Sequence, residues 1–348
     1  MGTKKGFLCI AAGLAIVSFS TAAVQLTTQE DSQATPAISG KYVVYSDGRA
    51  GNLDIWIYDL ETSQTWPICT EEHKQLNPAI DGDIVVWVDW RNGEQNKDIY
   101  GYNLSTQQEL VICNQPGNQR NPKIHGNRIV WDDSRNGNGD IYMLDLSTMV
   151  ETPICVESHD QLAPTVYGNL VVWEDNRNGN SDIYTRDLIS GFIFPICTNT
   201  NNQYYPAINE RYILWTDSRN STYDIYGYDM NLAKEIIICN SAGEQNHPRI
   251  SGSFVVWIDN RNGNFDIYGK DLGRGDEIVV FQGIGDQIGH NVDGKRVVWQ
   301  DNRLGDANWD IWMSCIGGSG LSADINSDCR VDFLDLGILA EQWMMTAY

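Results

Sequence analysis

The stretch that decides the fold is one copy of a repeat, and its fourth occurrence, residues 161–197, reads QLAPTVYGNLVVWEDNRNGNSDIYTRDLISGFIFPIC. A Gln stands three residues before a Pro, a Gly follows four residues after it, and a β-branched run ends at Trp173. An Asn-Gly pair then precedes Asp-Ile-Tyr, and an apolar run ends at Cys197. Because Asn and Gly both accept positive φ, this pair is a strong β-hairpin signal. One copy therefore predicts four short strands.

This unit occurs seven times, at intervals of 42 residues with one interval of 44. The Gln is present in every copy, as Gln33, Gln75, Gln119, Gln161, Gln203, Gln245 and Gln287. The Pro is present in six copies, as Pro36, Pro78, Pro122, Pro164, Pro206 and Pro248, and the seventh copy has His290 in its place. Four strands per unit of about 40 residues are typical of a β-propeller blade. A solenoid is the alternative, but its terminal repeats would have to be distinct caps.

The two ends of the repeat region complement each other instead. The seventh copy has no fourth strand after Met313, and the segment Val24 to Thr27 precedes the first copy. Thr27 lies nine residues before Pro36, which is the spacing of a fourth strand from the next Pro. We therefore predict an all-β, seven-bladed propeller of four-stranded blades over residues 24–316, closed by the N-terminal strand. Closure would remove two exposed sheet edges.

The repeated string Trp-x-Asp-x-Arg-Asn-Gly-Asn-x-Asp-Ile-Tyr-x-x-Asp-Leu resembles the WD-like propeller repeat of the TolB type. It is also similar to repeats of bacterial and archaeal cell-surface proteins. The resemblance covers residues 24 to 316 and implies the fold, whereas propellers of this kind serve many functions. If the Pro-x-Ile strand is innermost, the Gln-x-x-Pro loops and the Arg-Asn-Gly hairpins share one face of the ring, and the Gly turns share the other.

Composition and the N-terminus predict where the protein works. With 46 acidic and 24 basic residues, the net charge is −22, which argues against a nucleic-acid partner because phosphate binding needs clustered cations. Lys4 and Lys5 precede an apolar run and then small residues, so residues 1–23 are expected to be a secretory signal peptide. A retained membrane anchor is the alternative, since this run is just long enough to span. We expect the mature chain to be secreted or displayed at the cell surface, without membrane insertion.

Most recurrent polar residues are expected to stabilise the scaffold. In each hairpin an Arg stands between two Asp, as Arg177 does between Asp175 and Asp182, and it could bond both carboxylates. The Gln amides can bond backbone groups between blades, and the repeated Trp belong in the core between blades. Five Cys at one strand position predict buried free thiols. The pairing of Cys315 with Cys329 is left open.

Departures from the repeat on the face that carries the Gln residues indicate a recognition surface for a carbohydrate or a protein. Its candidates are Trp90, Tyr204, Tyr205 and Trp309, together with His247 and His290 at the entrances of two adjacent inner strands. Simple drift of the repeat is the competing explanation.

No catalytic residue is assigned. The sequence contains no Ser-His-Asp order, P-loop or HExxH motif. His247 and His290, with Gln245 and Gln287, could still form a metal or acid–base site, and some seven-bladed polysaccharide lyases look broadly like this. A paired-carboxylate glycosidase remains open because Asp is too abundant for one pair to be chosen.

The C-terminal residues form a second predicted module. After a Gly/Ser linker at residues 317–322, residues 323–348 contain a twelve-residue loop with oxygen donors in the EF-hand rhythm and then a short amphipathic helix. The predicted Ca²⁺ ligands are Asp324, Asn326, Asp328, Arg330 through its carbonyl, Asp332 and Asp335. The segment looks like one half of a type I dockerin, which implies docking onto a cohesin-like protein. Cys329 stands where such loops usually have Gly, and a dockerin normally has two loops.

Taken together, these features predict an exported, non-catalytic binding or scaffold propeller, held at the cell surface through a calcium-dependent tail and working near polysaccharide degradation. The alternatives are a polysaccharide lyase or glycosidase acting at the channel mouth, and a structural surface-layer protein.

Overall fold

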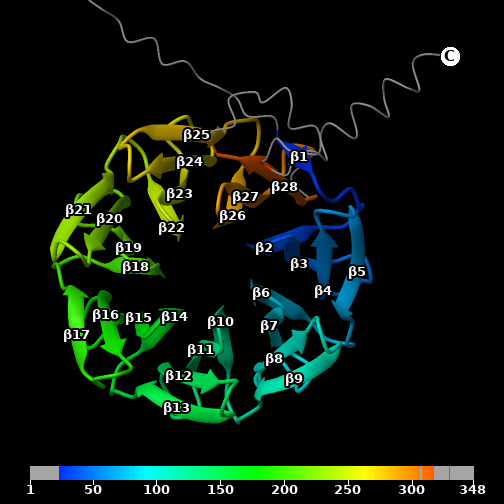
Figure 1. The fold of residues 1–348 in the computed structure, drawn as a ribbon, viewed down its shortest axis with the longest axis horizontal. Coiled ribbons are helices and arrows are strands. Elements are labelled where there is room, and N and C mark those ends of the chain that lie inside the picture. The colour runs from blue at the N-terminus through cyan, green and yellow to red at the C-terminus, as the bar shows by residue number, and fades with distance from the viewer. Residues whose placement is uncertain (1–22, 306–307, 317–328, 330–348) are drawn as a thin grey trace, which may run out of the picture.

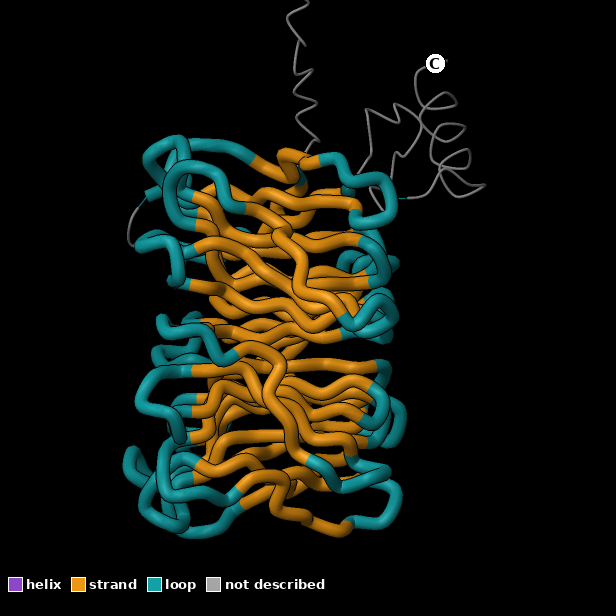
Figure 2. The backbone as a smooth tube through the Cα atoms, turned by 90° about the vertical axis from the view of Figure 1, so that its left-hand side faces the viewer, coloured by secondary structure: helices purple, strands orange, loops and turns teal. Residues whose placement is uncertain are grey.

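The chain folds into a ring of seven four-stranded antiparallel sheets around a central axis (Figure 1). The computed structural model describes residues 23–305, 308–316 and 329. Seen edge-on, the strands run between loops on the two faces of the ring (Figure 2). Within the described ranges there is no helix of the length and apolarity needed to cross a bilayer. The predicted all-β, seven-bladed propeller is therefore confirmed, while the predicted calcium loop, apart from Cys329, and the helix lie outside the described residues.

Each blade is numbered in chain order, and its first strand lies next to the axis. Blade 1 contains β2 (Gln33–Ser39), β3 (Tyr42–Asp47), β4 (Asp54–Asp59) and β5 (Gln64–Cys69). Blade 2 contains β6 (Gln75–Asp81), β7 (Ile84–Asp89), β8 (Asp98–Asn103) and β9 (Gln108–Cys113). Blade 3 contains β10 (Gln119–His125), β11 (Arg128–Asp133), β12 (Asp140–Asp145) and β13 (Val150–Cys155). Blade 4 contains β14 (Gln161–Tyr167), β15 (Leu170–Asp175), β16 (Asp182–Asp187) and β17 (Ile193–Cys197).

The remaining blades follow the same plan. Blade 5 contains β18 (Gln203–Ile208), β19 (Tyr212–Asp217), β20 (Asp224–Asp229) and β21 (Lys234–Cys239). Blade 6 contains β22 (Gln245–Ser251), β23 (Phe254–Asp259), β24 (Asp266–Asp271) and β25 (Glu277–Phe281). Blade 7 contains β26 (Gln287–Asp293), β27 (Arg296–Asp301), β28 (Asp310–Cys315) and, as its fourth strand, β1 (Val24–Gln25).

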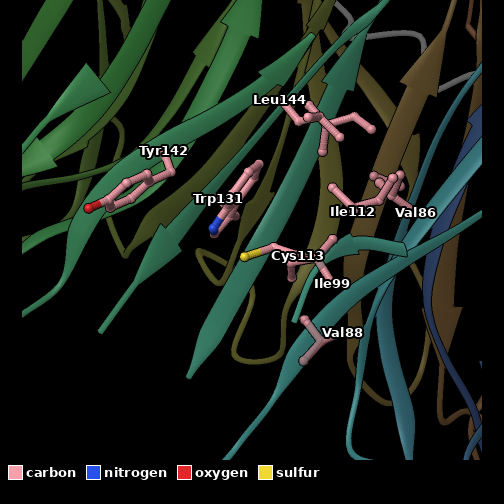
Figure 3. Close-up of a cluster of buried hydrophobic side chains, with 10 residues drawn as sticks. Val86, Val88, Ile99, Ile112, Cys113, Trp131, Tyr142 and Leu144 are labelled. Atoms are coloured by element: carbon pink, nitrogen blue, oxygen red, sulfur yellow. The ribbon is translucent and has the colours of Figure 1, made fainter. Parts of the chain in front are cut away.

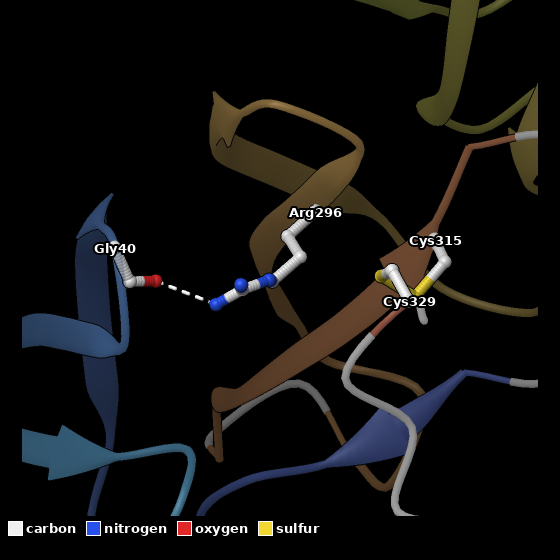
Figure 4. The surroundings of a disulfide bond; sticks show 4 residues. All are labelled: Gly40, Arg296, Cys315 and Cys329. Atoms are coloured by element: carbon white, nitrogen blue, oxygen red, sulfur yellow. Dashed lines mark hydrogen bonds between the residues drawn. A yellow bond between two sulfur atoms is a disulfide. The ribbon is translucent and has the colours of Figure 1, made fainter. Parts of the chain in front are cut away.

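The N-terminal strand closes the ring, as the repeat spacing predicts. Val24 pairs with Met313 and Gln25 with Trp312, so β1 adds to the edge of β28. Thr27 continues the contact beyond the strand, because its buried hydroxyl accepts the N–H of Ile311 at 2.8 Å. On the axis side of the same joint, Arg296 of β27 donates to the carbonyl of Gly40 in blade 1 at 2.6 Å (Figure 4). The first and last blades are thus joined at both the inner and outer strands.

The inner strands differ from the prediction in where they begin. We expected a Gln-x-x-Pro loop followed by a strand, but each inner strand starts at the Gln itself. A β-bulge separates the Gln from the rest of the strand, and the residue before the Pro position has φ between 47° and 61° in all seven blades. These residues are Thr35, Asn77, Asn121, Ala163, Tyr205, His247 and Gly289. The bulge restores pairing after the irregular residue, so the Pro does not end the strand.

Adjacent blades pack through seven apolar clusters, one for each interface between blades. Between blades 2 and 3, the side chains of Val86, Ile112 and Cys113 face Trp131 and Leu144 (Figure 3). Six repeated Trp residues and Tyr45 of blade 1 have no exposed surface. The prediction that the Trp residues form the core between blades is therefore confirmed.

A buried carboxylate at the end of the second strand links the Trp to the hairpin. In blade 4, Asp175 accepts Nε1 of Trp173 at 2.8 Å and Nη2 of Arg177 at 2.6 Å. The Arg177 guanidinium also lies over the ring of Tyr184 at 4.5 Å and donates to Sγ of Cys155, in the preceding blade, at 3.2 Å. The same Asp–Arg pair occurs in all seven blades. One Asp therefore orients the core Trp and an Arg that contacts the preceding blade.

The second Asp of each hairpin set is not a partner of the Arg, which corrects our prediction. Asp182 instead accepts the amides of Asn178 and Asn180, both at 2.7 Å. The Gln prediction is confirmed in its structural form: Gln161 is fully buried, and its amide donates to the carbonyl of His159 in the loop between blades. The five repeated Cys are buried free thiols, as expected, and burial raises the pKa of Cys113 to about 12.

The structure also joins Cys315, at the end of β28, to Cys329 through a disulfide (Figure 4). The bond attaches residue 329 of the C-terminal segment to the last blade. Cys329 has φ of 68°, in the region that usually favours Gly.

Closure of the ring can be tested by replacing Thr27 with Val, which keeps the shape of the side chain and removes its hydroxyl. The N–H of Ile311 then lacks an acceptor in a buried position, so we expect the free energy of unfolding to fall by about 1–3 kcal/mol. Chemical denaturation measures the change. The exposed neighbour provides the control, since Thr28→Val should have almost no effect; equal effects of the two variants would contradict the closure.

Candidate functional site in the central channel

All seven inner strands line a central channel that contains two adjoining cavities. One cavity, of about 340 Å³, lies toward the face that carries the buried Gln residues, here called the Gln face. The other, of about 370 Å³, lies toward the opposite face, which carries the Gly turns and is called the Gly face. Four residues line both cavities and mark the boundary between them: Lys123, Pro206, Arg249 and Asn291. We call this boundary the waist.

The waist contains two cationic side chains that lie close enough for the charge of one to act on the other. Lys123 on β10 and Arg249 on β22 occupy the position directly after the Pro, where the other blades have Ala37, Ala79, Thr165, Ala207 and Asn291. Among the described residues neither cation forms an ion pair, and Arg249 donates to the carbonyl of Pro248 at 3.0 Å. Burial and the charge of Arg249 lower the pKa of Lys123 to about 7, and burial also lowers the pKa of Arg249.

Two neutral histidines lie on the Gln side of the waist. His290 is almost fully buried, and its Nε2 lies 3.3 Å from the carbonyl oxygen of Val256. Burial and the nearby charge of Arg249 lower the pKa of His247 to about 3 and that of His290 well below its usual range. The buried Nδ1 of His247 has no hydrogen-bond partner among the described residues. At neutral pH both imidazoles are therefore uncharged and can accept as well as donate a hydrogen bond.

An aromatic run leads from the Gln face into this cavity. Tyr223 contacts Tyr204 with ring centres 6.4 Å apart, and Tyr204 contacts Tyr205 at 6.0 Å. Tyr205 stacks on His247 with ring centres 3.7 Å apart and planes at 23°. Tyr205 and His247 are the left-handed residues before the Pro of blades 5 and 6, and the unusual backbone places both rings beside the channel.

Neighbouring blades hold these bulges in place. The buried Glu174 of blade 4 accepts the backbone N–H of Tyr205 at 2.7 Å, and burial followed by the field of Asp132 raises the pKa of Glu174 to about 7. Between blades 7 and 1, Gln300 accepts the N–H of Thr35 at 2.7 Å. These carboxylate and amide groups stabilise the scaffold. In the part of the chain that the structure describes, no Asp or Glu lines the cavity on the Gln face.

The mouth on the Gly face is lined by carboxylates, and two of them bond backbone groups of neighbouring blades. Asp81, Glu210 and Asp293 line the cavity on the Gly face. Asp293 accepts the N–H of Gly40 at 2.7 Å and Asp81 accepts that of Gly126, so two of these carboxylates join Gly turns of neighbouring blades. The two mouths therefore differ: among the described residues, carboxylates line only the cavity on the Gly face, while the two cations of the waist border both cavities.

The predicted recognition residues all lie at the Gln end of their blades, but they do not form one patch. Tyr205 is 39% exposed, and Tyr204 is partly buried beside it. Trp90 follows β7, is partly buried against the core cluster, and lies under Lys97 at 4.4 Å. Trp309 precedes β28 and is also partly buried, with its carbonyl bonded to Gln33. The structure brings together Tyr204, Tyr205, His247 and His290, and leaves Trp90 and Trp309 away from the channel.

The sequence analysis missed Lys123 and Arg249. Each stands at a position that is small or neutral in the other five copies, so the irregularity was visible in the repeat. The residue after the Pro faces the channel only because the strand continues through the bulge. We had predicted a loop before the Pro, so this orientation was not expected. Among the described residues, no group of three or more His, Cys, Asp or Glu could hold a metal ion. The six predicted calcium ligands, Asp324, Asn326, Asp328, Arg330, Asp332 and Asp335, lie outside the described residues.

Comparisons with known proteins support the fold. No protein-family model matches the chain. No curated protein matches it either. An oligogalacturonate lyase solved in complex with manganese is similar with a TM-score of 0.67 and 12% identity, over 87% of this chain and 95% of that one. The propeller of the trilobed protease from Pyrococcus furiosus gives 0.65 and 15% identity, over 81% and 95%. That propeller is described as having an open velcro topology, whereas β1 closes the ring here.

TolB from Acinetobacter baumannii is similar with a TM-score of 0.50 and 20% identity, over 65% of this chain. The match spans 61% of that TolB chain. At these identities the likeness concerns the fold, and function has to be argued from the channel.

Replacing Lys123 by an apolar residue is expected to stabilise the protein, and to do so more at low pH than at high pH. The folded-state pKa of Lys123, about 7, lies below the ordinary value of 10.5, so the unfolded chain holds this proton more tightly. Lys123 therefore lowers stability most below pH 7, and the penalty decreases as the pH rises toward 10.5. Lys123→Met should raise the free energy of unfolding by about 1–3 kcal/mol at about pH 6 and by less at about pH 9.

Urea denaturation at the two pH values measures this change. Lys295, which is exposed at a Gly turn, supplies the control; Lys295→Met should change stability by less than about 0.5 kcal/mol at both. A destabilised Lys123→Met protein would show that the ammonium of Lys123 has a stabilising partner in the folded chain.

Proposed function

We propose that this chain is an exported binding propeller that takes its ligand at the Gln-face mouth of the channel and is held at the cell surface through its C-terminal segment. The observation that carries the proposal is the contrast between the two mouths. On the Gly face, Asp81 and Asp293 bond neighbouring turns. On the Gln face, aromatic and imidazole rings, amides and the two cations of the waist surround about 340 Å³ of space, and no Asp or Glu among the described residues lines it.

The aromatic run fits a carbohydrate ligand. Sugar rings expose C–H faces that pack on aromatic side chains and hydroxyls that pair with amide or imidazole groups. Tyr205 has its exposed surface at this mouth, with Tyr204 and His247 against it. A binding role in polysaccharide degradation is consistent with this chemistry, and the fold is shared with oligogalacturonate lyases.

The tail supports surface attachment through two observations. The disulfide between Cys315 and Cys329 joins the C-terminal segment to the last blade. Cys329 occupies the sixth position of the predicted calcium loop, where a positive φ is needed for the sharp turn, and its φ is 68°. Asp324, Asn326, Asp328, Asp332 and Asp335 would supply oxygen ligands to Ca²⁺, with the carbonyl of Arg330. Binding would order the loop for a cohesin-like partner.

A polysaccharide lyase is the second candidate, and Lys123 favours it. A lysine whose pKa is near 7 is partly neutral at physiological pH and can accept a proton, as an eliminating base must. Incubating the purified protein with polygalacturonate and measuring unsaturated chain ends in the ultraviolet separates the candidates. Turnover that disappears in Lys123→Met would establish the lyase, and stable binding without new chain ends would establish the binding protein.

The aromatic mouth can be tested with a substitution that the repeat itself supplies. Blade 4 has Ala163 at the position of Tyr205, with the same left-handed backbone, so Tyr205→Ala removes the ring without forcing a new conformation. We expect about tenfold or greater loss of affinity for the glycan that a carbohydrate array identifies. Phe192→Ala removes an exposed aromatic ring at the outer edge of blade 4 and should leave binding unchanged. If the two variants bind equally well, the mouth is not the recognition surface.

The tail can be tested by calorimetry with calcium on the full chain. Four carboxylates in one loop repel one another until a cation is bound, so we expect a calcium-dependent heat and a gain of helical circular dichroism. Asp324→Ala should remove both signals, whereas Asp276→Ala, an exposed carboxylate of blade 6, should retain them. Absence of heat in the unmodified chain would remove the calcium-dependent attachment and leave the channel proposal standing.

A further inference from the structure

The waist holds two cations without an acidic partner, although the chain as a whole is strongly acidic. The protein has a net charge of −22, and most of its arginines form ion pairs with Asp. Lys123 and Arg249 are half-buried cations of the channel wall without such a partner among the described residues. Three of the other inner strands have Ala at this position, so the scaffold does not need a cation there.

Half-buried cations without a partner destabilise a protein, because the partial loss of hydration is not offset by an opposite charge. The positions of the two residues make the cost larger, since the field of Arg249 acts on Lys123, His247 and His290. Binding sites are where such costs are commonly retained, because a ligand of opposite charge supplies the missing interaction.

From this arrangement we infer that the waist binds the carboxylate group of a hydroxylated acid, in particular a uronic acid unit of an acidic saccharide. The inference rests on the proposed function, because the ligand enters from the Gln face. Lys123 comes from blade 3 and Arg249 from blade 6, so they approach from different parts of the ring. A carboxylate has two oxygens, and one can accept from the ammonium while the other accepts from the guanidinium.

The hydroxyl part of the inference comes from the groups above the waist. His247 is neutral, and its Nδ1 is buried without a partner among the described residues. A ligand hydroxyl can satisfy this nitrogen in either tautomer, whereas a second anionic oxygen can do so in only one. Asn77 and Thr35 line the same cavity and offer further polar contacts. Tyr205 stacks on His247 and gives the ring face of a sugar an aromatic contact.

Phosphate and sulfate esters carry the same sign of charge, and the test has to distinguish them from a carboxylate. The probes are digalacturonate, the neutral disaccharide maltose, and inorganic phosphate, each titrated into the full chain by calorimetry and followed by thermal unfolding. We expect digalacturonate to bind and to raise the unfolding temperature, with no comparable effect of maltose or phosphate. Stronger binding of phosphate or maltose than of digalacturonate would overturn the inference.

The variants assign the binding to the waist. Lys123→Met and Arg249→Met should each lower the affinity for digalacturonate by about tenfold or more. Arg249→Lys should restore part of it, because a cation is present again without the planar fork of donors. Lys295→Met, an exposed cation on the Gly face, should bind like the unmodified protein. Thermal unfolding of each variant without ligand separates loss of binding from loss of folding.

Failure of the inference and failure of the proposed function give different results. If Tyr205→Ala removes binding while Lys123→Met and Arg249→Met leave it intact, the mouth binds the sugar and the waist does not. If neither digalacturonate nor any glycan of the array binds, both the inference and the carbohydrate function of the mouth are overturned.

Discussion

The buried carboxylate at the end of the second strand is the interaction on which each blade depends. Asp175 has no exposed surface, and it receives the indole N–H of Trp173 and the guanidinium of Arg177. The first bond fixes the Trp in the core between blades, and the second holds the hairpin and places the Arg against the Cys of the preceding blade. A charged acceptor in a buried position is costly unless it is fully paired. The Asp–Arg pair occurs in all seven blades, the Trp–Asp bond in the six blades that have the Trp, and the Arg–Cys contact at five interfaces, so the same bonds recur around most of the ring.

This repetition also fixes the frame on which the channel is built. The inner strands are held by their neighbours, and the left-handed residue before the Pro repeats in all seven blades. The backbone of the channel is therefore close to sevenfold regular, while the side chains are not. Lys123 and Arg249 replace small or neutral residues, and Tyr205 and His247 take the place of residues such as Ala163 and Thr35. Charged and aromatic side chains are thus placed on a regular backbone that accepts different residues at these positions. The proposed function depends on these differences from the repeat.

The repeat made most of the fold predictable because each of its residues has one dominant local role. Trp marked the core, Asn-Gly marked the hairpin, and the spacing of Thr27 to Pro36 identified the closing strand. The predicted start of the inner strand was wrong because Pro usually interrupts a strand. The bulge that accommodates the Pro depends on hydrogen bonds between blades, such as that from the N–H of Tyr205 to Glu174. The waist could not be located for the same reason: Lys123 and Arg249 are 126 residues apart, and only the ring brings their charges together.

On the reading developed above, two cations without partners among the described residues make the waist a carboxylate site. A crystal structure of the protein grown with digalacturonate provides the decisive test. We expect carboxylate density within hydrogen-bond distance of both Nζ of Lys123 and the guanidinium of Arg249, with the sugar ring extending toward Tyr205 and His247. Clear density for the ligand elsewhere on the ring, with the waist filled by water, would contradict it.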